Sequence, residues 1–453
     1  MYPYQEIGAE FLAATPQALL ADRMGLGKSA QVIRAADNLG LDSLLIFCPA
    51  NVKINWQREW ARFSPMDRPC TVLMTGRDKV PAEGVVICSY DLGANEKILA
   101  QLKRRRWQAI VLDECHFLKS RSAQRTKSIY GSSVRSPGLA AHTDRIWRLS
   151  GTPAPNDASE LWTHLKSAGV ITDAYYDFVY KFCTGYDSDF GFRITGHKNV
   201  PELKQLLGTF MLQRKVEDVM PQLPPIQYSE VTVARSKVEL DITFFEQMRG
   251  RSLPEFLNEI KTADTTLRNA LAQIKPEGTP LQDRVALLTT MAKSLVTLRR
   301  YIGMAKLPNV CDILAEELAS NQVEKVVVFA VHRDVIEGAR LKLAKFGAVT
   351  LYGGTDPKKK QLNVDKFMND PKCRVFIGNV QAAGTGITLT SACEVAFLEA
   401  DWVPSNNAQA AMRCHRIGQT KPVRVRYFSC EGSVDEQVQQ TLLRKSRELT
   451  KIF

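Results

Sequence analysis

The sequence lacks the features of membrane-spanning proteins and of zinc-binding proteins. No apolar run approaches the ~20 residues that a helix needs to cross a bilayer, so we expect no membrane association. The ten cysteines include no C-x-x-C pair and no cysteine–histidine cluster at zinc spacing. No signal peptide precedes them. We therefore expect reduced thiols inside a cell, in the cytoplasm or, for a eukaryotic source, in the nucleus.

Acidic residues are fewer than basic ones. The chain has 48 Asp and Glu against 60 Lys and Arg, a net charge of +12. Such an excess indicates a polyanionic partner, most simply nucleic acid, although a basic protein without that partner has the same balance. At 453 residues, with 45% apolar and 24% charged residues, the composition is that of a folded protein with two or three domains.

A glycine-rich turn near the N-terminus has most of the sequence of a phosphate-binding loop. The apolar residues 18–21 precede it and a helical pattern follows. Backbone N–H groups of such a loop close around phosphate oxygens, while its lysine and hydroxyl reach the terminal phosphates of ATP and Mg²⁺. The match is partial because Asp22 stands where the motif has glycine. The expected ligands are Gly25, Leu26, Gly27, Lys28 and Ser29.

Short apolar runs alternate with helical patterns in two parts of the chain. In the first part the runs are residues 43–48, 71–74, 85–89, 109–113 and 146–150. In the second part they are residues 325–331, 348–352, 374–378, 394–399 and 423–429. This alternation is typical of a mostly parallel sheet covered on both faces. We therefore predict an α/β fold of two doubly wound parallel-sheet lobes, with helical insertions.

Two adjacent carboxylates end the apolar run 109–113. Because the carboxyl ends of parallel strands meet at one edge of a sheet, we expect Asp113 and Glu114 beside the phosphate loop. There, Asp113 would hold Mg²⁺ and Glu114 would orient and deprotonate the attacking water of an ATPase. Taken alone, the pair could be an ordinary acidic turn; together with the loop, it favours a nucleotide site.

Two arginines near the C-terminus lie three residues apart. Arg413 and Arg416 share one face of a helix and so can converge on one phosphate. A guanidinium stays charged and stabilises charge on a transferred phosphoryl group. The alternative is a solvated basic helix.

Together these motifs resemble those of superfamily-two helicases and, more narrowly, of the Swi/Snf-type DNA translocases. The segments similar to motifs I, II, III, V and VI are residues 22–29, 113–116, 148–153, 378–390 and 409–419. The resemblance extends from residue 3 to about residue 445. The lack of long insertions and the residues 117–119 look most like the annealing-helicase (HARP-like) branch.

The resemblance implies two RecA-like lobes with ATP between them, and it implies roles for further residues. Gln5 is implied as an adenine contact and Gly386 as a nucleotide contact. The residues implied to couple the nucleotide site to DNA are Ser150, Gly151, Thr152 and Gln409. The implied DNA contacts are Pro49, Ala50, Trp56, Ser89, Tyr90, His332, Gly353, Lys360, Asn379 and Thr385.

The same resemblance suggests domain boundaries. The expected units are lobe 1 (1–156), its helical insertion (157–225), a linker strand with a helical insertion of lobe 2 (226–303), and lobe 2 with a C-terminal brace helix (304–453).

We predict a DNA-dependent ATPase that uses ATP and Mg²⁺ and moves along double-stranded or forked DNA as a monomer. The sequence names no recruiting protein. One alternative is an RNA or single-strand unwinding helicase of the same superfamily. A strand-splitting hairpin would favour it, and the sequence shows no clear candidate. The other is a non-hydrolysing DNA-binding protein, against which the intact Lys28, Glu114 and Arg416 argue.

Overall fold

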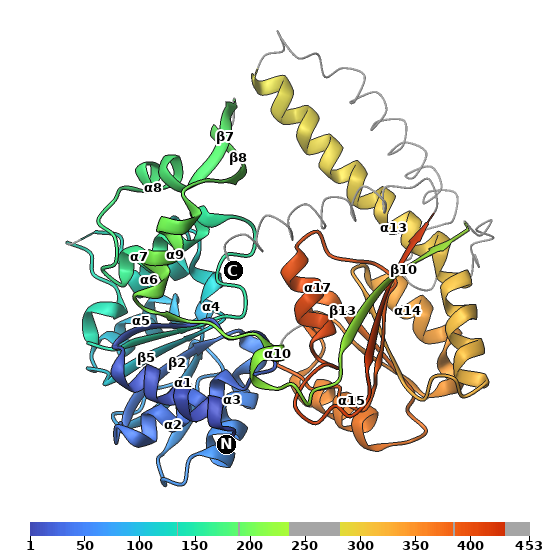
Figure 1. The fold of residues 1–453 in the computed structure, drawn as a ribbon, viewed down its shortest axis with the longest axis horizontal. Helices are drawn as coiled ribbons and strands as arrows, with labels where there is room; N and C mark the ends of the chain where they lie inside the picture. The colour runs from blue at the N-terminus through green and yellow to red at the C-terminus, as the bar shows by residue number, and fades with distance from the viewer. Residues whose placement is uncertain (134, 189–190, 235–280, 384–385, 431–453) are drawn as a thin grey trace.

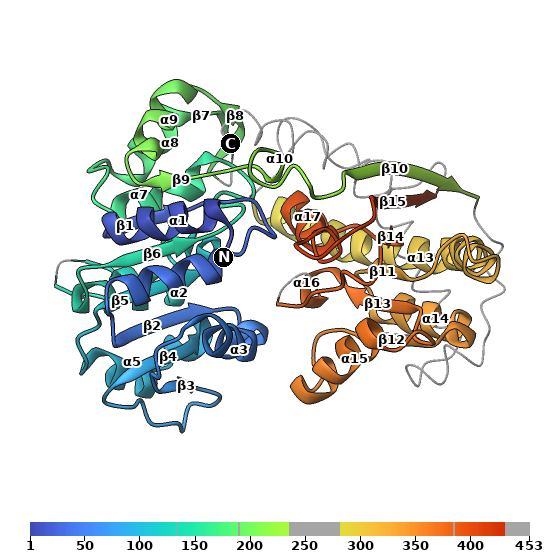
Figure 2. The same cartoon turned by 60° about the horizontal axis from the view of Figure 1, so that its bottom comes forward.

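The computed structural model describes residues 1–133, 135–188, 191–234, 281–383 and 386–430 of the chain. Two large parallel sheets, one in each of two lobes, dominate this part of the molecule (Figure 1). The chain passes from the first lobe to the second through α10 (Figure 2). Among the described helices, none has both the length and the apolar character needed to cross a bilayer.

The sheet of the first lobe has seven strands within the described residues, in the order β3-β4-β2-β5-β6-β1-β9. Every neighbouring pair is parallel. The strands are β1 (Gln17–Leu20), β2 (Ser43–Cys48), β3 (Cys70–Val72), β4 (Gly84–Ser89), β5 (Ala109–Asp113), β6 (Ile146–Leu149) and β9 (Met211–Leu212). The predicted parallel sheet is therefore confirmed.

Helices cover both faces of this sheet. Successive residues of one strand enter different cores: Leu44 packs with α1, α2 and α3, whereas Leu45 packs with α5, α6 and the insertion. Burial on both faces explains why the strands are continuous apolar runs. The helices are α1 (Pro3–Ala14), α2 (Lys28–Asn38), α3 (Lys53–Phe63), α4 (Tyr90–Gly93), α5 (Glu96–Lys103) and α6 (Gln124–Tyr130).

The insertion at 157–225 is only partly helical. Beside α7 (Trp162–Ser167), α8 (Tyr175–Phe182), α9 (Val200–Gly208) and α10 (Val216–Val219), it contains an antiparallel hairpin of β7 (Cys183–Ser188) and β8 (Gly191–His197). The hairpin projects from the outer end of the insertion (Figure 1). Its strands are rich in aromatic and β-branched residues, which favour extended backbone over helix. The prediction of helix was wrong for this segment.

The sheet of the second lobe has six strands in the described chain, in the order β10-β15-β14-β11-β13-β12, again all parallel. The strands are β10 (Ile226–Val233), β11 (Val326–Ala330), β12 (Ala348–Leu351), β13 (Val375–Asn379), β14 (Glu394–Phe397) and β15 (Val423–Cys430). Helices α13 and α14 cover one face, and α15, α16 and α17 cover the other. These helices are α13 (Leu281–Ala319), α14 (Arg333–Lys342), α15 (Pro357–Asn369), α16 (Val380–Ala383) and α17 (Pro404–Ala411).

The predicted boundaries of the second lobe can be compared with the structure only in part. The boundary proposed between residues 303 and 304 falls inside α13, which runs unbroken across it. Much of the insertion at 226–303, the brace segment after residue 430, and Thr385 lie outside the described residues.

Candidate active site

A cavity of about 580 Å³ lies between the two lobes. The first lobe contributes Gln5, Gly25, Gly27, Lys28, Ser29, Asp113 and Glu114 to its lining, and the second contributes Gly386, Arg413 and Arg416. The lobes approach closely here: at Gly386 of the second lobe, an added Cβ would lie only 3.1 Å from Val52 Cγ2 of the first lobe. The structure thus brings nearly all residues predicted for the nucleotide into one cavity. Leu26 is buried beside it, and its carbonyl accepts a hydrogen bond from Gln5 Nε2 (3.3 Å).

The phosphate loop joins the end of β1 to the start of α2. Two of its glycines have left-handed backbone, with φ of 89° at Gly25 and 69° at Gly27. At Gly27 an added Cβ would also lie 2.5 Å from Gln5 Nε2, so the turn requires glycine there. Lys28 Nζ donates to the Asp22 carbonyl (2.8 Å), and burial lowers the lysine's pKa. The loop therefore places an amine and backbone N–H groups at a helix N-terminus.

Asp22, the departure from the usual loop motif, has a structural partner. Its side chain is fully buried, and its Oδ1 accepts a hydrogen bond from Arg214 Nε (2.9 Å). Gln31 Nε2 donates to Oδ2 (3.1 Å). Arg214 follows β9, so this ion pair ties the end of the insertion to the phosphate loop. Sequence reasoning missed Arg214 because 192 residues separate it from Asp22 and no local pattern links them.

Asp113 is held at two points. Trp56 Nε1 donates to its carboxylate Oδ2 (2.8 Å), and the Tyr90 hydroxyl donates to its backbone carbonyl (2.7 Å). Burial and the neighbouring Glu114 carboxylate raise the pKa of Asp113 to about 7, while the indole hydrogen bond and Lys28 act in the opposite direction. A nearby cation would stabilise the ionised form of this carboxylate.

Glu114 has φ of 53°, a conformation that a non-glycine residue adopts rarely. Its Oε1 accepts a hydrogen bond from Gln409 Nε2 of the second lobe (3.0 Å), and His116 Nδ1 lies 3.3 Å from Oε2. Burial alone would raise the carboxyl pKa, but His116 and the cations Lys28 and Arg413 outweigh it and hold the pKa below its ordinary value. Glu114 is therefore placed as a carboxylate that can accept a proton.

The segment after β6 lies against His116, the neighbour of Glu114, and against the phosphate loop. His116 Nδ1 lies 3.1 Å from Ser150 Oγ, which also accepts the N–H of Thr152 (3.1 Å). A Cβ added at Gly151 would lie 2.8 Å from Met24 Cγ. Three of the residues predicted to couple the nucleotide to DNA thus lie against the nucleotide site.

The two arginines are held by backbone and hydroxyl oxygens of their own lobe. Arg413 Nη1 donates to the Ile387 carbonyl (3.4 Å). Arg416 Nη1 donates to the same carbonyl (3.3 Å) and to Thr388 Oγ1 (3.3 Å). Within the described residues neither guanidinium forms an ion pair with a carboxylate. Both line the cavity and present positive charge to it.

The oxygen atoms in the cavity fit a magnesium ion that arrives with its nucleotide. The carboxylate of Asp113 and the hydroxyl of Ser29 are hard donors of the kind that Mg²⁺ prefers. In the described part of the chain, no three His, Cys, Asp or Glu side chains gather as a metal cluster. A protein with so few ligands holds Mg²⁺ together with water and substrate phosphates.

Two aromatic residues assigned to DNA by resemblance point instead to the nucleotide site. Trp56 is 1% exposed and Tyr90 is 2% exposed, and both hydrogen-bond to Asp113. Tyr90 also stacks between Phe47 and Phe117. Both side chains are buried in this structure, and their assignment to DNA stays a prediction.

The other predicted DNA contacts divide between surface and interior. In the first lobe Ala50 is exposed, but Pro49 and Ser89 are buried. In the second lobe His332 Nδ1 lies 2.7 Å from Glu399 Oε1, and Asn379 Nδ2 donates to the Val331 carbonyl (2.8 Å). These half-buried hydrogen bonds hold both side chains at the strand ends.

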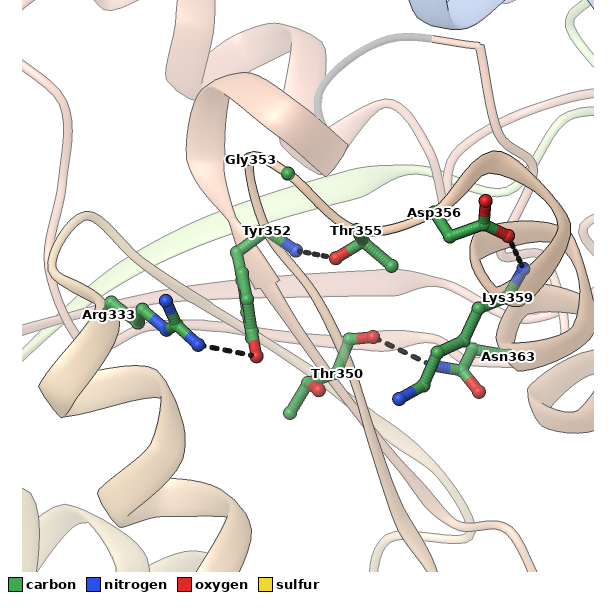
Figure 3. Close-up of a pocket in the computed structure, with 9 residues that line it drawn as sticks. Arg333, Thr350, Tyr352, Gly353, Thr355, Asp356, Lys359 and Asn363 are labelled. Atoms are coloured by element: carbon green, nitrogen blue, oxygen red, sulfur yellow. Dashed lines mark hydrogen bonds between the residues drawn. The ribbon is translucent and has the colours of Figure 1, made fainter. Parts of the chain in front are cut away.

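Gly353 lies on a separate small pocket of about 270 Å³ beside β12 (Figure 3). Arg333 and Lys359 line this pocket, and Arg333 Nη2 donates to the Tyr352 hydroxyl (3.5 Å). Lys360 does not line it: its Nζ donates to the Ala382 carbonyl (3.5 Å), and burial with nearby Arg413 lowers its pKa to about 8. Arg333 and Lys359 are both exposed beside Gly353.

Comparison with known proteins agrees with these motifs. The SNF2-related domain family matches residues 4–277, and the helicase conserved C-terminal domain family matches residues 305–418. The chain is 30% identical to the SWI/SNF-related matrix-associated actin-dependent regulator of chromatin subfamily A-like protein 1 of Xenopus tropicalis, over 99% of this chain and 44% of that protein. It is 27% identical to the DNA annealing helicase and endonuclease ZRANB3 of Mus musculus, over 99% of this chain and 40% of that protein.

The chain thus spans less than half the length of these relatives. A solved structure, the Sulfolobus solfataricus SWI2/SNF2 ATPase core in complex with dsDNA, is 22% identical over 100% of this chain and 96% of that one, with a TM-score of 0.44. The family match covers more than half of the residues and includes the phosphate loop and the acidic pair. The chain therefore belongs to the SNF2-related domain family, and its two parallel-sheet lobes have the fold predicted for that family.

Proposed function

We propose that the chain is a DNA-dependent ATPase that moves along double-stranded DNA as a monomer. One observation carries the proposal: a single cavity joins the phosphate loop and acidic pair of one lobe to the two arginines of the other. A site divided between two lobes suits an enzyme whose ATP cycle opens and closes them. The names of the relatives, one of them a DNA annealing helicase, agree with this activity.

Each group in the cavity has a proposed role in ATP hydrolysis. The loop N–H groups and Lys28 bind the phosphates, while Ser29 and Asp113 would hold Mg²⁺, which supplies charge neutralisation when bound. Glu114 orients the water and accepts its proton. Arg413 and Arg416 stabilise the charge that develops on the phosphoryl group once the lobes close.

The same geometry offers a route from the nucleotide to the rest of the molecule. A change at Glu114 reaches Ser150 through His116, and it reaches the second lobe through Gln409. ATP binding and hydrolysis would therefore bias how the lobes sit relative to each other. DNA bound across both lobes, mainly through its phosphates, would be moved by that cycle.

The β7–β8 hairpin favours a second candidate, the unwinding of single strands or RNA. The sequence shows no clear candidate for a strand-splitting hairpin, whereas the structure has a β-hairpin at the outer end of the insertion (Figure 1). Tyr186 is 54% exposed on this hairpin and lies opposite exposed Arg193 on the neighbouring strand. An aromatic ring beside a guanidinium can stack on an unpaired base and hold its phosphate.

Steady-state ATP hydrolysis distinguishes the candidates. It is measured without nucleic acid and with duplex DNA, forked DNA, single-stranded DNA and RNA, with Lys28→Ala as the blank. Strong stimulation by duplex supports the translocase, and stimulation by RNA or single strands alone supports the second candidate. Hydrolysis equal to the blank under every condition would contradict both.

The double variant Tyr186→Ala/Arg193→Ala tests the hairpin in the same assay. If the hairpin engages a fork, stimulation by forked DNA falls to the duplex value while stimulation by duplex stays unchanged. Tyr228→Ala, which removes a tyrosine that is 52% exposed on β10, is the control. Unchanged stimulation by forked DNA would exclude the hairpin from fork recognition.

A further inference from the structure

The indole of Trp56 contacts the nucleotide site from behind. Trp56 lies on α3, and its side chain packs in the core that α1, α2 and α3 form on one face of the first sheet. From there Nε1 donates to Asp113 Oδ2 at 2.8 Å. Asp113 itself lines the cavity between the lobes. The carboxylate therefore has the core on one side and the nucleotide cavity on the other.

This hydrogen bond restricts how the Asp113 carboxylate can turn. With Oδ2 held by the indole, rotation about the side-chain bond would break a charge-assisted hydrogen bond in a buried place, which is costly. The Tyr90 hydroxyl holds the backbone carbonyl of the same residue. Both ends of Asp113 are thus anchored, which leaves Oδ1 as the carboxylate oxygen without an indole partner.

We propose that Trp56 is a positioning residue for Mg²⁺, holding the Asp113 carboxylate so that one oxygen is directed to the ion that accompanies ATP. The inference rests on the proposed ATPase function and extends it beyond the residues that touch the nucleotide. Partners that orient a ligating carboxylate typically set metal affinity by about 10- to 100-fold.

An indole suits this task better than other donors. Its N–H only donates, carries no charge and does not titrate, so it can neither compete with the ion as a cation nor coordinate the ion itself. Its large ring is fixed by packing: Trp56 is 1% exposed. A lysine at this place would bring a second positive charge to the carboxylate and oppose Mg²⁺.

Trp60 provides a matched control on the same helix. It lies one turn beyond Trp56, packs in the same core and is 2% exposed. Within the described residues its Nε1 has no hydrogen-bond partner. Trp56→Phe and Trp60→Phe therefore remove similar buried area, but only the first removes a hydrogen bond to Asp113.

The test measures binding of a fluorescent ATP analogue to the full chain, titrated with Mg²⁺ and repeated in EDTA. We expect Trp56→Phe to raise the Mg²⁺ midpoint about tenfold or more and to leave affinity in EDTA unchanged. In the hydrolysis assay excess Mg²⁺ should restore most of the kcat. Trp60→Phe should keep the wild-type midpoint.

Two results would overturn the inference: a wild-type Mg²⁺ midpoint in Trp56→Phe, or an equal shift in Trp60→Phe, which would indicate loss of packing. Should Trp56→Phe fail to fold, the indole N–H spectrum of ¹⁵N-tryptophan-labelled protein replaces it. Asp113→Asn should then shift one of the six tryptophan signals strongly, and an unchanged spectrum would refute the contact. If the wild type binds the nucleotide but hydrolyses no ATP at any Mg²⁺ concentration, the proposed function fails instead.

Discussion

At the scale of single residues, Glu114 combines backbone strain with contacts that hold it in place. Its left-handed φ of 53° is stabilised by a partner on each carboxylate oxygen, His116 on one side and Gln409 on the other. Such strain persists only where the surroundings over-determine the conformation, and it is common at functional sites. The carboxylate is thereby aimed at the cavity in ionised form.

Glu114→Gln tests the proposed base. The amide fills the same space but cannot take a proton from water, so ATP binding should stay within about threefold while turnover falls by at least about 10². Binding of a fluorescent ATP analogue and steady-state hydrolysis measure the two effects. Near-normal hydrolysis would remove Glu114 from the role of base.

Arg416→Ala tests the second-lobe arginines. Because the guanidinium acts on charge that develops only in the transition state, hydrolysis should fall by about 10³ or more with little loss of ATP affinity. Lys372→Ala, which removes an exposed cation of the same lobe, is the control. Wild-type turnover in Arg416→Ala would place the charge-stabilising role elsewhere.

The residues of the nucleotide site were predictable because short motifs specify them. Spacing alone identified Lys28, Asp113 and Arg416, and all three line one cavity. Sequence could not identify Arg214 as the partner of Asp22, or Trp56 as the partner of Asp113. Those contacts depend on how distant elements pack, which no local pattern encodes.

At the scale of elements, the ends of β11 and β14 are joined by one buried carboxylate. Glu399 follows β14, and its Oε2 accepts the N–H groups of Val331 and His332 (both 2.9 Å). Its Oε1 lies 2.7 Å from His332 Nδ1. Burial alone would raise the pKa of Glu399, but the His332 contacts and backbone N–H groups outweigh it and lower the pKa.

Glu399→Gln tests the contribution of these hydrogen bonds to stability. Loss of the charge-assisted bonds should lower the free energy of unfolding by about 1–3 kcal/mol at pH 7. Because the pKa of Glu399 is lower in the folded than in the unfolded chain, its ionised carboxylate stabilises the fold at pH values above the unfolded-state pKa. The difference in the free energy of unfolding between wild type and variant should therefore shrink as the pH falls below the ordinary pKa of 4.5. Urea unfolding at several pH values measures it.

The control for this joint is Glu324→Gln, which removes an exposed carboxylate paired with Lys421. Exposed ion pairs of this kind contribute about 0–1 kcal/mol, so the control should unfold nearly as wild type. A penalty for Glu399→Gln that is constant across the whole pH range would contradict the role of its charge.

The strands were more predictable than the insertions. Ten predicted apolar runs of the two sheets correspond to strands within a few residues, because fully buried parallel strands leave a continuous apolar signal. The hairpin of β7 and β8 was missed because its half-exposed strands interrupt a helical neighbourhood. The two-residue strand β9 is too short to leave any pattern.

At the scale of the whole molecule, the net charge of +12 favours DNA binding through phosphates, and such binding weakens as the salt concentration rises. Each phosphate contact contributes about −0.9 to the slope of log K against log salt. Two contacts would therefore cost about tenfold in affinity between 50 and 200 mM salt, and more contacts would cost more. Fluorescence anisotropy of labelled duplex measures this slope, and a flat response would exclude a phosphate-dominated interface.

The hydrogen bond from Gln409 to Glu114 joins the lobes at the proposed base, so it tests whether lobe closure and hydrolysis are coupled. A hydrogen bond to a charged group contributes about 1.5–3 kcal/mol, so Gln409→Ala should lower DNA-stimulated hydrolysis about tenfold or more. ATP affinity should change less than about twofold, because the groups that bind ATP stay in place. Gln381→Ala removes an amide that donates to Asp401 within the second lobe and should leave stimulation intact. If Gln409→Ala retains full stimulation, DNA signals to Glu114 by another route, of which the Ser150–His116 contact is the next to test.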